Sequence, residues 1–170
     1  CNTVPLIRNL QAAWPETPLT WLIGKIERSV VGDIPGIEFL TYDKAAGTLD
    51  GLPVGDVLRQ RRFGLLLDLQ ASWRANILAL RVHAPVKLGF DRRRARDGQW
   101  LFTNRRIAPA PQAHVAEGFL SFGDALGIAR GPLRWEIPIP EADRAFAAEL
   151  IPDHRPTLVL SPCSSQRART

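Results

Sequence analysis

Seven of the chain's basic residues fall between Lys87 and Arg106, where only two acidic residues accompany them. The local balance of +5 equals the formal charge of the whole 170-residue chain. Charge focused in this way is typical of a site that binds an anion. The other interpretation is a solvated surface, because charge runs often only keep a protein soluble.

Short apolar segments that alternate with helical patterns must position this basic stretch. The strands expected from the pattern are 19–23, 37–42, 65–67, 86–90 and 157–161. The helices expected between and around them are 4–14, 25–32, 54–62, 73–81, 114–126 and 141–150, with a loop at 47–55. Apolar strands that alternate with helices predict an α/β domain with a parallel sheet, and the run 65–67 suits a strand buried on both faces.

Polar residues follow almost every predicted strand. In parallel sheets, ligands bind beyond the carboxyl ends of the strands, so these residues are expected on one rim. They are Gly24-Lys25, Tyr42-Asp43, Asp68 to Gln70, Asp91-Arg92 and Ser161 to Arg169. This shared rim favours a ligand site over a solvated surface.

The acidic and histidine side chains near the rim have open roles. Asp68, Asp91 or Asp97 could supply a general base, since an Asp at a strand end is well placed for one. For Asp91 and Asp97 we favour pairing with arginine, because four arginines lie within five residues. His114 precedes a helical stripe and is more typical of a helix cap than of a catalyst. Thr3 and Ser72 are expected as further caps.

The chain's last ten residues, SPCSSQRART, follow the last predicted strand. Ser164 and Ser165 supply hydroxyl groups, and Arg167 and Arg169 supply guanidinium groups, which together suit a pyrophosphate. A frayed tail is the alternative, because chain ends are often poorly ordered.

Other function classes leave little trace in the sequence. It contains no glycine-rich dinucleotide motif, no Walker sequence, no histidine pattern for a metal or a triad, and only two cysteines. No stretch approaches the roughly 20 apolar residues that a membrane span needs. A non-enzymatic, nucleic-acid-binding domain stays open, since Trp100, Phe102 and Arg105 could stack on bases, although no known motif supports it.

The order and spacing of several segments resemble one known family. They include FGLLLDLQASWRAN, KLGFDRRRARDGQWLFTNRR, HVAEGFLSFGDALG and LVLSPCSSQRAR. Together they resemble the ADP-heptose:lipopolysaccharide heptosyltransferases, glycosyltransferase family nine, over almost the whole chain. Members often carry an arginine where this chain has Gly118.

The resemblance implies a GT-B fold of two Rossmann-like domains. Residues 1–150 would be the N-terminal, acceptor-binding domain without its first strand, which is expected just before Cys1 together with the Asp that serves as base. Residues 151–170 would be the linker and the first strand and phosphate loop of the donor domain. On this view the full-length protein is an inverting glycosyltransferase, and these residues alone would be inactive.

The resemblance also assigns residues and partners. Acceptor contacts would come from Gln70, Arg74, Arg96, Asn104, Arg105 and His114; donor-phosphate contacts would come from Ser164, Ser165, Arg167 and Arg169. The donor would be ADP-heptose and the acceptor the Kdo/heptose inner core of lipopolysaccharide, with no cofactor and no metal required. A cytoplasmic enzyme, peripheral at the inner face of the inner membrane and in contact with its anionic surface, is expected. Another bacterial glycan is the alternative acceptor.

Overall fold

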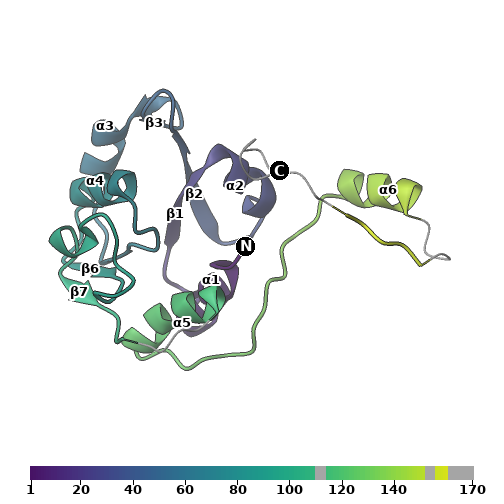
Figure 1. The fold of residues 1–170 in the computed structure, drawn as a ribbon. Helices are drawn as coiled ribbons and strands as arrows, with labels where there is room; N and C mark the ends of the chain where they lie inside the picture. Colours follow the sequence, from purple (N-terminus) through teal and green to yellow (C-terminus); the bar gives the residue numbers. More distant parts are fainter. Residues whose placement is uncertain (110–113, 152–155, 161–170) are drawn as a thin grey trace. The chain divides into compact units, whose positions relative to one another are not determined.

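The structure is a computed structural model that describes residues 1–109, 114–151 and 156–160. The chain divides into two compact units, Cys1–Ile137 and Pro138–Thr170 (Figure 1). The predicted functional boundary at residue 150 stays a prediction. No helix in the described ranges is long and apolar enough to cross a membrane.

The first half of the first unit forms a sheet of four strands in the order β1-β2-β3-β4. β1 and β2 are parallel, in a register that pairs Leu19 with Ile37 and Gly24 with Tyr42. The predicted loop at 47–55 is wrong in part, because it contains the short antiparallel strands β3 and β4. The elements are α1 (Val4–Ala13), β1 (Leu19–Gly24), α2 (Lys25–Val31), β2 (Ile37–Asp43), β3 (Thr48–Leu49), β4 (Leu52–Pro53) and α3 (Val54–Arg59).

The second half forms a parallel sheet in the order β5-β6-β7. The prediction of a parallel α/β fold is confirmed, but the parallel strands form two sheets, and β7 was not expected. β5 is half-buried rather than fully buried, because one of its edges is open. The elements are β5 (Leu65–Leu67), α4 (Trp73–Arg81), β6 (Val86–Gly89), the 3-10 turn η1 (Gln99–Leu101), β7 (Arg105–Arg106) and α5 (Val115–Ala125).

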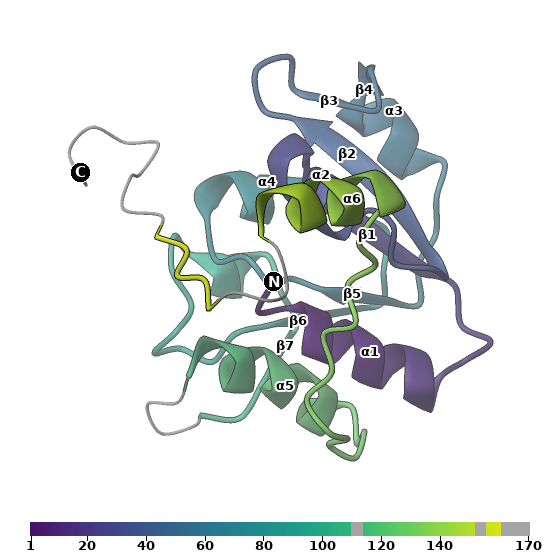
Figure 2. The ribbon, with the colours of Figure 1, turned by 90° about the vertical axis from the view of Figure 1, so that its right-hand side faces the viewer.

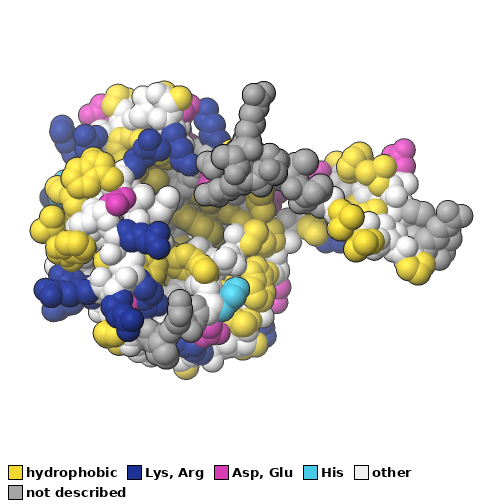
Figure 3. All heavy atoms as spheres, viewed as in Figure 1, with side chains coloured by type: hydrophobic (Ala, Val, Ile, Leu, Met, Phe, Trp, Pro, Cys, Tyr) yellow, Lys and Arg dark blue, Asp and Glu magenta, His cyan; other side chains and the backbone are white. Residues whose placement is uncertain are grey.

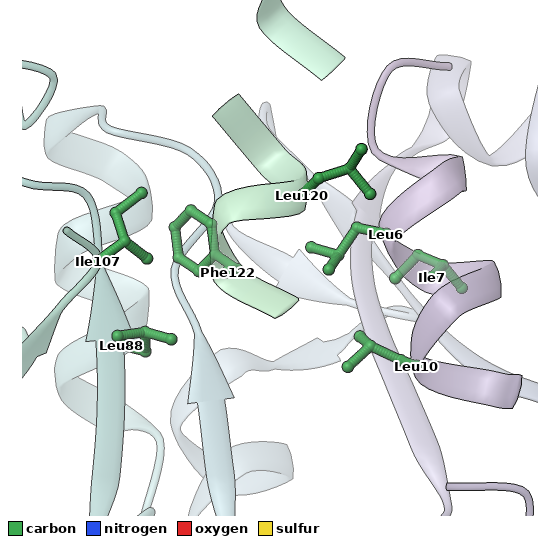
Figure 4. Close-up of a cluster of buried hydrophobic side chains, with 7 residues drawn as sticks. All are labelled: Leu6, Ile7, Leu10, Leu88, Ile107, Leu120 and Phe122. Carbon is green, nitrogen blue, oxygen red and sulfur yellow. The ribbon is translucent and has the colours of Figure 1, made fainter. Parts of the chain in front are cut away.

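Helices cover the sheets on both faces. α1 and α5 lie side by side in both ribbon views (Figures 1 and 2). Their apolar faces meet β6 in one buried cluster, in which Phe122 is fully buried (Figure 4). Each such side chain contributes about 1.5–3 kcal/mol on burial. The cluster's members are Leu6, Ile7, Leu10, Leu88, Ile107, Leu120 and Phe122.

Local signals set some of the helix ends. Ser72 caps α4 as predicted, since its hydroxyl accepts a hydrogen bond from the Ala75 N–H at 3.4 Å. Thr3 precedes α1 but makes no side-chain cap bond, so that prediction is wrong. Gly127 ends α5 with φ of 73°, a conformation that favours glycine. Val115, the first residue of α5, is exposed.

The second unit contains α6 (Glu141–Leu150), at the bounds predicted from the sequence. None of its residues is buried. The strand predicted at 157–161 is not found: residues 157–160 do not form a strand. Ser161 lies outside the described residues.

Candidate anion-binding site

The loop from Asp91 to Gly98, which follows β6, is built around a buried carboxylate. Asp91 is 3% exposed, and its side chain accepts hydrogen bonds from the Arg93 N–H at 2.9 Å and from Nε of Arg94. Burial raises the pKa of Asp91, but these hydrogen bonds and the charge of Arg94 outweigh it and leave the pKa lowered. The predicted Asp91–arginine pairing is confirmed, and it keeps this carboxylate ionised.

Asp97 does something different from what the sequence suggested. Its carboxylate accepts a hydrogen bond from the Trp73 N–H at 2.9 Å, and its carbonyl accepts one from Asn76 Nδ2 at 2.9 Å. The carboxylate therefore satisfies a free N–H group in the first turn of α4 and pairs with no arginine in the described chain. This contact places Arg96 beside the beginning of α4.

Arg94 connects the same loop to α5. Its guanidinium lies 5.7 Å from the centre of the Phe90 ring and donates to the Ala108 carbonyl at 3.3 Å. A Cβ atom at Gly118 would lie 3.2 Å from Nη1 of Arg94. The absence of a side chain at Gly118 thus leaves room for Arg94.

The loop therefore lies near the first turns of two helices, α4 and α5. Helix N-termini carry partial positive charge, which adds to that of the loop arginines. Arg92, Arg93 and Arg96 are exposed, and none forms an ion pair with a residue that the structure describes. Figure 3 shows Lys and Arg side chains gathered over α3, α4 and the β6–β7 sheet, beside an apolar hollow. This arrangement suits a carboxylate or phosphate ligand.

Gln70 and Arg74 also lie at this end of the second sheet. Gln70 follows β5, and its carbonyl accepts a hydrogen bond from the Ser72 N–H at 2.8 Å. Arg74 is exposed in the first turn of α4, directly after Trp73, whose N–H donates a hydrogen bond to Asp97. The structure therefore places Gln70, Arg74 and Arg96 near the beginning of α4, and their role in acceptor binding stays a prediction.

Asn104 and Arg105 are placed apart from that corner. The Asn104 amide accepts from the Lys87 N–H and donates to the Pro85 carbonyl, both at 2.8 Å, at the beginning of β6. Its side chain is thus engaged in joining β7 to β6. Arg105 pairs with Leu88 along the strands and is exposed. Their predicted role in acceptor binding stays a prediction.

His114 is the N-cap of α5. Its Nδ1 accepts a hydrogen bond from the Ala116 N–H at 3.3 Å, and its carbonyl accepts one from the Gly118 N–H at 3.1 Å. The capping interpretation is confirmed. The exposed ring leaves its other nitrogen available for a ligand.

Gln99 is the important residue that sequence reasoning missed. It is fully buried, donates from Nε2 to the Asp68 carbonyl at 2.9 Å and accepts at Oε1 from the Phe90 N–H at 3.1 Å. Gln99 therefore joins the carboxyl ends of β5 and β6. In the sequence, the only hint was that Gln99 directly follows Asp97 and Gly98. In the structure, both of those residues adopt positive φ.

The first sheet carries a comparable polar contact at its own carboxyl end. Lys25, which follows β1, donates to Asp43 at the end of β2 at 2.6 Å. Hydrogen bonds from Lys25 and from the Ala46 and Ala45 N–H groups lower the pKa of Asp43 to about 2. Polar residues thus follow β1, β2, β5 and β6 as predicted, but these strands form two sheets, so one shared rim stays a prediction.

Several predicted contacts cannot be compared with the structure. Ser164, Ser165, Arg167 and Arg169 lie outside the described residues. Within the described ranges, no group of three or more His, Cys, Asp or Glu side chains is placed to hold a metal ion.

Comparison with known proteins adds independent findings. Residues 53–170 match the family described as glycosyltransferase family 9 (heptosyltransferase). The chain is 37% identical over 166 residues to the lipopolysaccharide core heptosyltransferase OpsX of Haemophilus influenzae, covering 98% of this chain and 48% of that protein. The chain thus spans about half the length of this curated relative.

Two solved structures share the fold. The E. coli heptosyltransferase WaaC with ADP-2-deoxy-2-fluoro heptose matches with a TM-score of 0.67 at 20% identity, over 80% of this chain and 48% of that one. A glycosyltransferase of family 9 from Veillonella parvula matches with a TM-score of 0.66 at 20% identity, over 90% of this chain and 45% of that one.

Proposed function

The chain belongs to glycosyltransferase family 9, and we propose on this basis that the full-length protein transfers heptose from ADP-heptose to the Kdo/heptose inner core of lipopolysaccharide. The described unit supplies the acceptor side. The observation that carries this assignment is the pair of exposed guanidinium groups of Arg74 and Arg96 beside the first turn of α4, neither of which forms an ion pair with a residue that the structure describes. Kdo is an acidic sugar, and the inner core also carries phosphate, so both offer the oxygens that a guanidinium binds.

In the proposed reaction, a base removes the proton of the acceptor hydroxyl as that oxygen attacks the anomeric carbon from the face opposite ADP. The bond to ADP breaks, and positive groups stabilise the negative charge that develops on the departing diphosphate. Arg96, Arg74 and Gln70 hold the acceptor. Ser164, Ser165, Arg167 and Arg169 are proposed to contact the donor phosphates, and the reaction as proposed needs no metal or other cofactor.

We further propose that this end of the protein touches an anionic membrane surface at the inner face of the inner membrane. Trp73, Trp100 and Leu101 are 59%, 44% and 73% exposed. Trp100 and Leu101 follow the loop arginines in the sequence, and the Trp73 N–H donates to Asp97 of the same loop. Tryptophan favours the membrane–water interface, and basic residues favour anionic lipid. Such a surface would bring the acceptor, which is anchored in lipid, to the site.

The test uses the full-length protein with ADP-heptose and a Kdo-bearing lipid A acceptor, and it measures ADP release. The proposal predicts release only when both substrates are present. Release with a different glycan in place of this acceptor would assign another family 9 pathway. No release with any nucleotide sugar, from protein shown to be folded, would overturn the proposal.

A further inference from the structure

A basic pocket lies at the amino ends of β5 and β6. Its volume is about 570 Å³, which is within the range of small-molecule pockets. The residues that line it come from the segment ahead of β5, from the end of α4 and from the segment that leads into β6. They are Arg62, Phe63, Gly64, Leu80, Val82, His83, Ala84, Pro85 and Lys87. We call it the Arg62–Lys87 pocket.

The pocket and the loop from Asp91 to Gly98 lie at opposite ends of the same sheet. Gly64 comes just before β5 and Pro85 just before β6, whereas the loop follows β6. The four residues of β6 span about 13 Å, at about 3.3 Å per residue in a parallel strand. A ligand in the pocket would therefore be separate from a ligand held by Arg96.

Arg62 and His83 are direct neighbours in this pocket. They form a parallel β-bridge, and the Phe63 N–H donates to the His83 carbonyl at 2.9 Å. Both side chains are exposed, and neither forms an ion pair with a residue that the structure describes. Like charges on paired residues of neighbouring strands are destabilising, so an anion between a guanidinium and a protonated imidazole would be favourable.

Lys87 adds an ammonium group that lacks a counter-ion. Its side chain is half-buried, and Nζ donates to the Ala79 carbonyl at 2.6 Å, which leaves two N–H donors for a ligand. Burial lowers the pKa of Lys87, and no Asp or Glu forms an ion pair with it in the described part of the chain. A desolvated cation without an anion is costly, and a bound anion would offset that cost.

The rest of the lining indicates what kind of anion fits. No acidic side chain is among the described residues that line the pocket. Three basic side chains suit a group with several anionic oxygens, as phosphate has. Leu80, which is 57% exposed, and Val82 supply an apolar wall beside the basic groups. The pocket therefore suits a phosphate group that is attached to an organic body.

We propose that the Arg62–Lys87 pocket binds a phosphate ester, with the phosphate group on Arg62, His83 and Lys87 and the organic part against Leu80. A soluble phosphate ester and the headgroup of an anionic phospholipid share this chemistry, and binding to vesicles separates them. The proposal does not rest on the proposed function, because the pocket and the acceptor contacts lie at opposite ends of the second sheet.

NMR of the His83 ring in the full-length protein tests whether phosphate binds. Histidine is isotope-labelled, the His83 signal is identified by its loss in His83→Gln, and inorganic phosphate replaces chloride at constant pH and ionic strength. We expect the His83 signal to shift along a saturable curve. A signal that stays fixed, or that moves in proportion to phosphate without saturating, would overturn the proposal.

Two substitutions test whether the named side chains hold the phosphate. Arg62→Gln and Lys87→Met should each raise the Kd for inorganic phosphate by at least about 5-fold, because each removes a charge-assisted hydrogen bond. Arg59→Gln, which removes an exposed arginine outside the pocket, is the matched control and should change the Kd by less than about 2-fold. Equal weakening in Arg59→Gln and Arg62→Gln would overturn the proposal, since overall charge would then explain the binding.

Vesicle binding and a soluble ester distinguish the two sources of the phosphate. The full-length protein is cosedimented with phosphatidylcholine vesicles that contain phosphatidic acid, and the His83 signal is titrated with glycerol 3-phosphate. For a lipid headgroup, Arg62→Gln should weaken vesicle binding more than Arg59→Gln does. For a soluble ester, the two variants should bind vesicles equally, and glycerol 3-phosphate should bind more tightly than inorganic phosphate. Failure of both expectations would overturn the assignment to a phosphate ester.

Discussion

The buried side-chain amide of Gln99 donates a hydrogen bond to the carbonyl oxygen of Asp68 across 2.9 Å. Its other end accepts from Phe90, so one side chain holds the ends of β5 and β6 together. The loop from Asp91 to Gly98 begins directly after this link. The position of the loop arginines therefore depends on an uncharged, fully buried residue.

Replacing Gln99 with Ala should destabilise the protein strongly. The change leaves two buried backbone groups without partners, at about 1–3 kcal/mol each, and also opens a cavity. We expect the free energy of unfolding, measured by urea titration, to fall by roughly 3 kcal/mol. Gln60→Ala, at the exposed end of α3, is the control and should stay within about 0.5 kcal/mol. If both changes lowered the free energy of unfolding equally, the hydrogen bonds of Gln99 would not stabilise the fold as described.

Arg94 should matter for stability more than its exposed neighbours do. Arg94→Ala would leave the buried Asp91 carboxylate without its ion-pair partner, which should cost about 2 kcal/mol. Because the pKa of Asp91 is lowered in the folded protein, its stabilising contribution is present above the ordinary Asp pKa and is lost as the pH falls through the folded value. Urea titrations at neutral and acidic pH measure both effects. Arg92→Ala should be close to neutral, and a comparable loss in that variant would contradict the assignment.

The Lys25–Asp43 pair gives a prediction that NMR can check directly. Asp43 should titrate at about 2, below its ordinary value of 3.8, and should return toward that value in Lys25→Met. Since the folded pKa is the lower one, the pair's contribution to stability disappears as the pH falls from about 4 to about 2. Carbon-detected carboxyl titration measures the shift. Lys44→Met, a change to the exposed lysine next to Asp43, should leave the Asp43 titration unchanged.

Arg96 should act on the acceptor and leave the donor unaffected. Arg96→Ala in the full-length protein should lower kcat/KM for the Kdo-bearing acceptor by about 10- to 100-fold, as expected for a lost charge-assisted contact. The KM for ADP-heptose should stay unchanged. Arg81→Ala, at the other end of α4 from Arg74, is the control for general loss of positive charge. If both variants lowered kcat/KM for the acceptor equally, the loss would reflect the overall charge of the protein and not a specific contact of Arg96.

Membrane contact should depend on the exposed aromatic and apolar side chains beside the arginines. The double change Trp100→Ser and Leu101→Ser should weaken cosedimentation of the full-length protein with vesicles that contain anionic lipid. Added salt should weaken it further, because the basic contribution is screened. Leu52→Ser, at an exposed position on β4, is the control. Binding that the double change leaves intact would place the contact elsewhere.

Sequence reasoning found most elements because their signals were local. The alternation of apolar strands and helices located β1, β2, β5 and β6, and Ser72 was identified correctly as a cap. The roles that it missed depend on contacts between distant segments. Asp97 lies 24 residues from Trp73, and Gln99 lies 31 residues from Asp68.

The division into two sheets could not be read from hydrophobic pattern alone. The pattern shows that Leu65 to Leu67 form an apolar strand, but not which strand lies beside them. β7 was missed because Arg105 and Arg106 are charged and exposed, and their strand character comes only from pairing with β6. Gln70, Arg74 and Arg96 were assigned to the acceptor by the family resemblance, and that assignment stays a prediction.

The most direct test of heptose transfer is the mass of the acceptor after reaction with the full-length protein. After incubation with ADP-heptose and Kdo-bearing lipid A, the acceptor should gain the mass of one heptose residue, and one ADP should appear for each product formed. Arg96→Ala should slow this gain, and Arg81→Ala should not. An acceptor of unchanged mass, with folded protein and both substrates present, would contradict heptose transfer to this acceptor.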